Sequence, residues 1–187
     1  MTILAITATA VLVASAAAAP PERLVEGKPL GQWIDVVRTG ETQSSDWPKA
    51  VAALKASREG AIPLLLPLLD DKEGRVRVAA VLLLTDMSPL TADVVSAFIK
   101  ASADPRTRMV ALNGLGRPAA SRKDVVPTLQ AALKDPSHHV RATAARSLGN
   151  LGREGMPAVA ALTAALADDK DLVRTAAQEA LRKIRGQ

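Results

Sequence analysis

The amino-acid sequence predicts an all-α solenoid, a single stack of helix pairs. The first observation is composition: among 187 residues there are two Trp, one Phe and no Tyr, while 48% are hydrophobic. Ala, Leu and Val supply most of that content, and a composition rich in Ala and Leu but poor in aromatic residues favours helices over a β-sandwich. The second observation is an internal repeat of 31 to 33 residues, a period typical of helical solenoids.

The repeat is marked by an arginine that is followed by Ala after three residues and by Leu after seven. Four arginines fit this pattern: Arg77, Arg108, Arg141 and Arg174. Trp47 stands 30 residues before the first of them, with Ala50 and Leu54 at the same offsets. We therefore expect a fifth, degenerate unit at the start of the array, because terminal repeats are often atypical.

Each unit contains two helical patterns separated by a turn. In the unit around Arg141, one apolar face is formed by Val125, Val126, Leu129 and Leu133, and the next by Val140, Ala144, Leu148 and Leu151. The breaks fall at Asp70-Asp71, Asp104-Pro105, Asp135-Pro136-Ser137 and Asp168-Asp169, and Gly116, Gly149 and Gly152 are expected where second helices end. The predicted units cover about 29–58, 60–88, 89–119, 121–152 and 155–186. Pro67 should kink or shorten the first helix of its unit, because proline removes a helical hydrogen bond.

The N-terminal segment is predicted to direct export. The first nineteen residues contain no charged side chain, residues 3–14 are apolar, and Ala16 and Ala18 are small residues suited to signal peptidase. We expect a signal peptide over 1–18, a linker over 19–28 and a periplasmic or secreted product. The alternative is an uncleaved segment that anchors the chain to the membrane, although Ala and Thr make it only marginally apolar for a span.

Residues 135–152, DPSHHVRATAARSLGNLG, resemble the HEAT repeat, specifically the short bacterial type also found in phycobilisome lyase subunits. The resemblance implies a right-handed α-solenoid of about five HEAT-like helix pairs, whose second helices line a concave side. Such repeats serve mostly as scaffolds, so the resemblance implies a fold and no particular activity.

The repeated acidic and basic residues are interpreted as a structural ladder. In similar repeats the aspartate lies in the turn between helices, and the arginine reaches toward it or toward the turn of the next unit. The ladder residues are Asp71, Arg77, Asp104, Arg108, Asp135, Arg141, Asp168 and Arg174. Asp104 precedes its arginine by four residues, whereas the others do so by six, and we expect a weaker register there.

Several kinds of chemistry are disfavoured, so we predict no enzyme activity, cofactor or metal. The chain has no cysteine. His138 and His139 are adjacent in a predicted turn, and neighbours on a helix point about 100° apart, which does not make a compact metal site. The chain has no His-Glu pair of the kind found in iron hydroxylases built on similar repeats, and no glycine-rich phosphate loop. Trp33 and Trp47 are expected to plug the N-terminal end of the stack.

Charge indicates the character of a partner. Residues 1–93 hold 9 basic and 11 acidic side chains, while residues 94–187 hold 15 and 8. Positions five and nine residues after the repeat arginines lie opposite the apolar stripe of the second helices, and they hold Asn113, Arg117, Arg146, Asn150, Glu179 and Lys183. We expect this surface to bind a protein partner, possibly acidic. The alternative is an anionic polymer bound by the basic C-terminal half; nucleic acid is disfavoured because stacking aromatics and dense Lys/Arg fields are missing.

Overall fold

The computed structural model describes residues 24–39, 41, 43–87, 90–117 and 124–186. The predicted signal peptide and the first residues of the predicted linker lie outside this part. Within it, no helix has the length and apolar character needed to cross a membrane.

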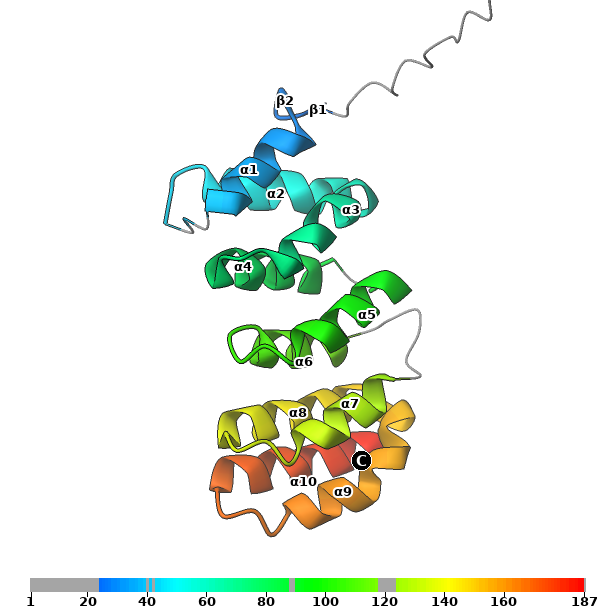
Figure 1. The fold of residues 1–187 in the computed structure, drawn as a ribbon. Helices are drawn as coiled ribbons and strands as arrows, with labels where there is room; N and C mark the ends of the chain where they lie inside the picture. Colours follow the sequence, from blue (N-terminus) through cyan, green and yellow to red (C-terminus); the bar gives the residue numbers. More distant parts are fainter. Residues whose placement is uncertain (1–23, 40, 42, 88–89, 118–123, 187) are drawn as a thin grey trace, which may run out of the picture.

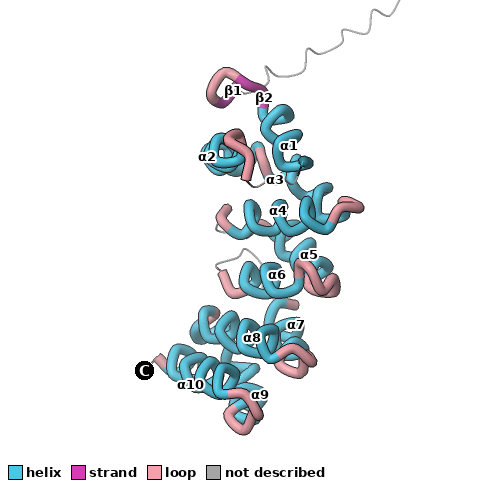
Figure 2. The backbone as a smooth tube through the Cα atoms, turned by 90° about the vertical axis from the view of Figure 1, so that its left-hand side faces the viewer, coloured by secondary structure: helices cyan, strands magenta, loops and turns pink. Residues whose placement is uncertain are grey.

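The all-α solenoid is confirmed. Helix pairs stack in sequence order along one axis, as Figures 1 and 2 show from two sides. The first helices of the pairs are α1 (Leu30–Thr39), α3 (Ile62–Leu65) with η2 (Leu66–Asp70), α5 (Ala92–Ala101), α7 (Val125–Ala132) and α9 (Val159–Ala165). The second helices are α2 (Trp47–Ser57), α4 (Gly74–Thr85), α6 (Arg108–Leu115), α8 (His138–Asn150) and α10 (Asp171–Arg185). The 3₁₀ turns η1 (Arg58–Gly60) and η3 (Gly152–Ala158) precede α3 and α9.

The inner second helices α4, α6 and α8 are the most deeply buried elements. In α8, eight of thirteen residues are buried, including Ala142, Ala144, Ala145 and Leu148. Such small side chains let a helix pack against both neighbouring units. Exposed positions are consequently confined to a narrow stripe along each of these three helices.

The first helix of the second unit is broken as Pro67 predicted. Its α-helical part ends at Leu65, and the chain continues as the 3₁₀ turn η2 with Pro67 inside it. A 3₁₀ turn has three residues per turn, so side chains three positions apart lie above one another.

The N-terminal end differs from the predicted linker. Residues Leu24–Val25 (β1) and Lys28–Pro29 (β2) form a short antiparallel hairpin. Glu26 and Gly27 both have positive φ, 51° and 76°, which is the backbone of a two-residue type I′ turn. The hairpin lies against Trp33, whose Nε1 donates a hydrogen bond to the Val25 carbonyl at 3.0 Å. Trp33 is 1% exposed, and Trp47 packs half-buried against the same core.

Two glycines assigned to helix ends have a packing role. A Cβ on Gly116 would lie 2.8 Å from Ser147 Cα, and one on Gly149 would lie 2.7 Å from Ala180 Cα. Gly116 does follow the end of α6, but Gly149 lies within the last turn of α8. Glycine at these positions lets the next second helix approach closely.

Candidate functional site

Every ladder arginine first closes its own turn. Its guanidinium donates a hydrogen bond to the carbonyl six residues earlier: Arg77 to Asp71 (2.7 Å), Arg108 to Ser102 (3.0 Å), Arg141 to Asp135 (3.0 Å) and Arg174 to Asp168 (2.6 Å). These bonds fix the angle between the two helices of a unit.

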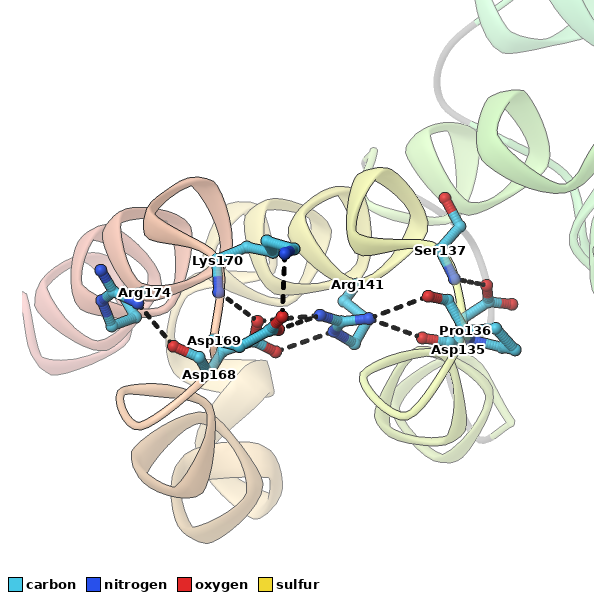
Figure 3. Close-up of polar contacts among 8 residues, drawn as sticks. All are labelled: Asp135, Pro136, Ser137, Arg141, Asp168, Asp169, Lys170 and Arg174. Atoms are coloured by element: carbon cyan, nitrogen blue, oxygen red, sulfur yellow. Dashed lines mark hydrogen bonds and ion pairs between the residues drawn. The ribbon is translucent and has the colours of Figure 1, made fainter.

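Three of the arginines also reach the next unit. Arg77 contacts Asp104 at 2.8 Å, Arg108 contacts Asp135 at 2.9 Å and Arg141 contacts Asp168 at 2.7 Å. The separation along the chain is 27 residues each time. Figure 3 shows Arg141 between the two turns, with Asp135 on one side and Asp168 on the other. The second contact of Arg174 is with Asp171 in its own helix.

The ladder aspartates accept hydrogen bonds in their turns, and three of the four do so at both carboxylate oxygens. One oxygen accepts a hydrogen bond from the backbone N–H two residues later: Asp71 from Glu73, Asp104 from Arg106, Asp135 from Ser137 and Asp168 from Lys170. In the last three, the other oxygen accepts from the arginine of the preceding unit. These three carboxylates are therefore poorly placed for acid–base chemistry, because each oxygen already accepts a hydrogen bond.

The unusual spacing of Asp104 and Arg108 changes how Arg108 contacts the next unit. The register between the units is kept. Arg108 reaches Asp135 through Nη1, whereas Arg141 holds Asp168 through both Nε and Nη2 in a bidentate pair. The shortened turn before Arg108 is closed by the buried Thr107, whose hydroxyl donates to the Ala101 carbonyl at 2.6 Å. The 27-residue separation is thus maintained despite the shift of Asp104.

The ladder lowers the pKa of two aspartates. The hydrogen bond from Arg141 holds the pKa of Asp168 far below its usual range, against the opposing effect of burial. The backbone N–H of Arg106 lowers the pKa of Asp104, with Arg77 contributing. Asp168 in turn raises the pKa of Arg141.

These shifts predict a loss of stability in acid. A carboxyl whose folded pKa is depressed stabilises the fold above its unfolded pKa, about 3.9, and this contribution disappears as the pH falls toward the folded value. We expect the melting temperature to be nearly constant from about pH 7 to 5 and to drop below about pH 4. Asp168→Asn should have a lower melting temperature than the parent protein at pH 7. Its melting temperature, followed by circular dichroism, should fall less on acidification than that of the parent. Parallel pH profiles for the two proteins would contradict this.

The predicted binding residues lie along the exposed stripe of the second helices. Asn113, Arg146, Asn150, Glu179 and Lys183 are exposed, and Arg117 is half-buried. Among these six residues, the structure brings Lys183 and Asn150 into direct contact: Lys183 Nζ donates to Asn150 Oδ1 at 2.9 Å, which joins α10 to α8.

Sequence reasoning missed part of this stripe. The same offsets from Arg77 give Leu82, 46% exposed, and Asp86, which pairs with Lys55 of α2 at 2.6 Å. Met109, one residue after Arg108, is 45% exposed. Positions two before Arg77 and Arg108 hold the exposed Arg75 and Arg106. Applying the offsets to the unit of Arg77 would have found Leu82 and Asp86. Extending them by one and two helical turns toward the N-terminus would have found Met109, Arg75 and Arg106.

We call this stripe the second-helix face, and it comprises Arg75, Leu82, Asp86, Arg106, Met109, Asn113, Arg117, Arg146, Asn150, Glu179 and Lys183. Its guanidinium groups differ from those of the ladder. In the described part of the chain, Arg75, Arg106, Arg117 and Arg146 take part in no ion pair. The Nε of Arg117 is shielded from solvent and has no hydrogen-bond partner there. The face therefore offers free donors beside exposed apolar side chains.

The histidines are neighbours at the start of α8, with ring centroids 4.1 Å apart. Across the described ranges, no cluster of three or more His, Cys, Asp or Glu is arranged to hold a metal.

Comparison with known proteins identifies the repeat. A family model for HEAT repeats matches residues 92–182, and one for a single HEAT repeat matches residues 61–90. The complex of CpcE and CpcF of phycocyanin lyase from Nostoc sp. PCC7120 is similar in structure, with a TM-score of 0.70 and 23% identity over 81% of this chain and 96% of that one. A designed armadillo repeat protein in complex with the peptide (KR)4 has a TM-score of 0.58 and 18% identity, covering 82% of each chain. No curated protein sequence matches significantly.

Proposed function

The chain belongs to the HEAT-repeat family, and from this premise we propose that it is an exported, non-catalytic scaffold that binds a protein partner through the second-helix face. In this family the second helices line the concave side, so a partner would be held along several units at once. Recognition spread over repeats in this way is the usual function of extended solenoid surfaces.

The observation that carries the proposal is the group of unpaired arginines beside exposed apolar side chains. Arg75, Arg106 and Arg146 extend across three successive units, with Leu82 and Met109 among them. Arginine and methionine are enriched at protein interfaces, where guanidinium groups make directional bonds to carboxylates. An acidic segment of the partner protein fits this surface best.

The absence of catalysis is part of the proposal. The carboxylates of Asp104, Asp135 and Asp168 are bonded at both oxygens, and the two histidines face each other. One structural neighbour carries the name of a lyase, but at 23% identity this similarity concerns the fold.

Export is proposed from the sequence of residues 1–18. Their lack of charge, apolar stretch and small residues near Ala18 are typical of a signal peptide. A partner would then be a periplasmic or extracellular protein. If the segment is not cleaved, the same face would act at the membrane surface.

The second candidate function is binding of an anionic polymer, such as an acidic polysaccharide. It is favoured by the charge asymmetry, because residues 94–187 hold 15 basic and 8 acidic side chains. Binding of this kind weakens steeply with salt, which separates it from a packed protein interface.

Affinity capture with matched charge variants tests the proposal. The purified chain is used as bait for periplasmic and membrane fractions of its host, at low and high salt. Arg75→Glu/Arg146→Glu reverses two exposed charges on the face, and Lys134→Glu/Arg153→Glu makes the same change at other exposed positions. We expect the parent chain to capture a defined protein whose binding persists at high salt. The control variant should capture the same protein, and the face variant should bind it about tenfold or more weakly. Equal capture by both variants would contradict binding through the second-helix face. Recovery of only a polymer that is released by salt would favour the second candidate function.

A further inference from the structure

A groove runs between the first helices of the second and third units, away from the second-helix face. It consists of two clefts, of about 690 Å³ and 360 Å³, that share Leu66 and Asp93. One wall is the broken helix α3–η2, and the other is α5. Both volumes fall within the range of about 300–1,000 Å³ that is usual for ligand pockets.

The prolines create the first wall. In a 3₁₀ turn, residues three apart are eclipsed, so Leu66 and Leu69 of η2 lie on one side of it. Pro63, three residues before Leu66 in α3, also lines the groove. The broken helix thus presents a continuous apolar wall.

The second wall is one face of α5 with small side chains. Asp93, Ala97, Lys100 and Ala101 follow the helical spacing and line the groove. The methyl groups of the two alanines leave room above them. Asp93 stands at the first turn of α5 and Lys100 near its last turn, so the ends of the wall are charged and its middle is apolar.

Equivalent clefts in the following units are smaller. The cleft between α5 and α7 is about 340 Å³, and that between α7 and α9 is about 240 Å³. Ile99 in the third unit and Gln130 in the fourth lie at the same distance before their turn aspartates as Leu66 does in the second. Pro157 in the last unit lies at the same distance before its turn aspartate as Asp93 does in the third. There Gln130 Nε2 donates to the Pro157 carbonyl at 3.1 Å and closes the space, whereas Leu66 and Asp93 make no such bond.

The charges of the groove select the kind of occupant. Four carboxylates and two cations line the larger cleft. Arg77 is held by Asp104, and Lys100 pairs with Asp70 across the opening at 2.7 Å, with both side chains mostly exposed. Among the described residues, Asp71 and Asp93 have no ion-pair partner. An exposed pair such as Lys100–Asp70 contributes little to stability, so an incoming cation can replace Lys100.

We propose that this groove binds a basic, aliphatic segment of another protein. The stem of a lysine or arginine packs on Leu66 and Ala97, and its charged end meets Asp93 or Asp71. An aliphatic neighbour in the segment contacts Leu69 and Ala101. This site goes beyond the second-helix face, which prefers an acidic partner, and together the two surfaces would let the scaffold hold two different proteins.

Peptide probes of defined composition test the groove on the full chain. Three fluorescein-labelled dodecapeptides alternate Lys with Leu, Glu with Leu, or Lys with Gly, and binding is followed by fluorescence anisotropy at about 0.15 M salt. Ala97→Trp fills the groove; Ala161→Trp makes the same change at the equivalent half-buried position beside the smallest cleft. Asp93→Asn removes one unpaired charge. Arg75→Glu/Arg146→Glu serves as the control for the second-helix face.

We expect the Lys/Leu peptide to bind best, to weaken about tenfold with Ala97→Trp and about threefold with Asp93→Asn, and to be unaffected by Ala161→Trp. Arg75→Glu/Arg146→Glu should not weaken it, so that failure of the groove and failure of the second-helix face are distinguishable. Circular dichroism and thermal melting check that both tryptophan variants are folded. If Ala97→Trp is not folded, binding of the three peptides to Asp93→Asn tests the proposal instead. The proposal would be overturned if the Glu/Leu peptide bound as tightly as the Lys/Leu peptide, or if no peptide bound. It would also be overturned if neither Ala97→Trp nor Asp93→Asn changed the affinity.

Discussion

Replacing Trp33 with alanine is expected to lower the free energy of unfolding of the N-terminal units by about 3–5 kcal/mol. Trp33 is 1% exposed and is among the largest fully buried side chains of the chain. The substitution leaves a cavity at an end of the stack and removes the bond from Nε1 to the Val25 carbonyl. It also removes the ring that faces Lys28 Nζ at 4.7 Å.

The loss should be local, because the stability of a solenoid is roughly a sum of unit and neighbour contributions. Hydrogen exchange should speed up in α1 and α2 and remain nearly unchanged in α8 and α10. Trp33→Phe is the control: it keeps most of the volume and loses the hydrogen bond, so its effect should be clearly smaller. Uniform acceleration along the whole chain would contradict a stack of separable units.

The second large effect is expected from Gly149→Ala. The added methyl would lie 2.7 Å from Ala180 Cα and 2.9 Å from its Cβ. Because the nearest atom belongs to the backbone of α10, the two helices must separate, and overpacking of this kind costs about 1–3 kcal/mol. This cost outweighs the gain of about 1 kcal/mol that alanine usually brings inside a helix.

Gly60→Ala provides the matched control for this substitution. Its methyl would meet Leu30 Cδ1 at 3.5 Å, an ordinary contact. Urea denaturation of both variants should show a lower midpoint for Gly149→Ala and little change for Gly60→Ala. A Gly149→Ala protein as stable as the parent would show that the α8–α10 contact is looser than the structure has it.

The ladder shows how much of the fold was accessible from sequence. A fixed spacing of Arg, Ala and Leu was enough to predict helix pairs, because solenoid units repeat the same contacts. The structure joins residues of the predicted ladder by hydrogen bonds between successive units. The constant separation of 27 residues between each arginine and the aspartate of the next unit was not deduced, since it depends on how units stack.

Other features depended on three-dimensional contacts. Gly149 was assigned to a helix end because glycine is common there, but the close approach of Ala180 explains it. Residues 24–28 were taken as part of a linker, since paired prolines masked the turn at Glu26 and Gly27. The groove beside α5 was missed as well. The sequence showed that Pro67 would disturb a helix, but not that the broken helix would form a groove with α5.

The binding role of the candidate surface stays a prediction; its residues lie along the exposed side of the second helices, and the exposed stripe extends beyond them. The offsets were applied to three units and stopped before the unit of Arg77, where Leu82 is exposed. Helical periodicity alone gives the side of a helix that is exposed. Which exposed charges are left unpaired follows from the contacts between units.

Photo-cross-linking from the second-helix face tests the central claim most directly. A photoreactive amino acid is placed at Asn113 on α6, and in a separate protein at Thr163, an exposed residue of α9 on the first-helix side. If the chain is a scaffold that binds through its second helices, a partner protein from the host should be cross-linked from position 113 and not from position 163. Cross-linking of the partner from position 163 alone, with the complex intact in both proteins, would contradict it.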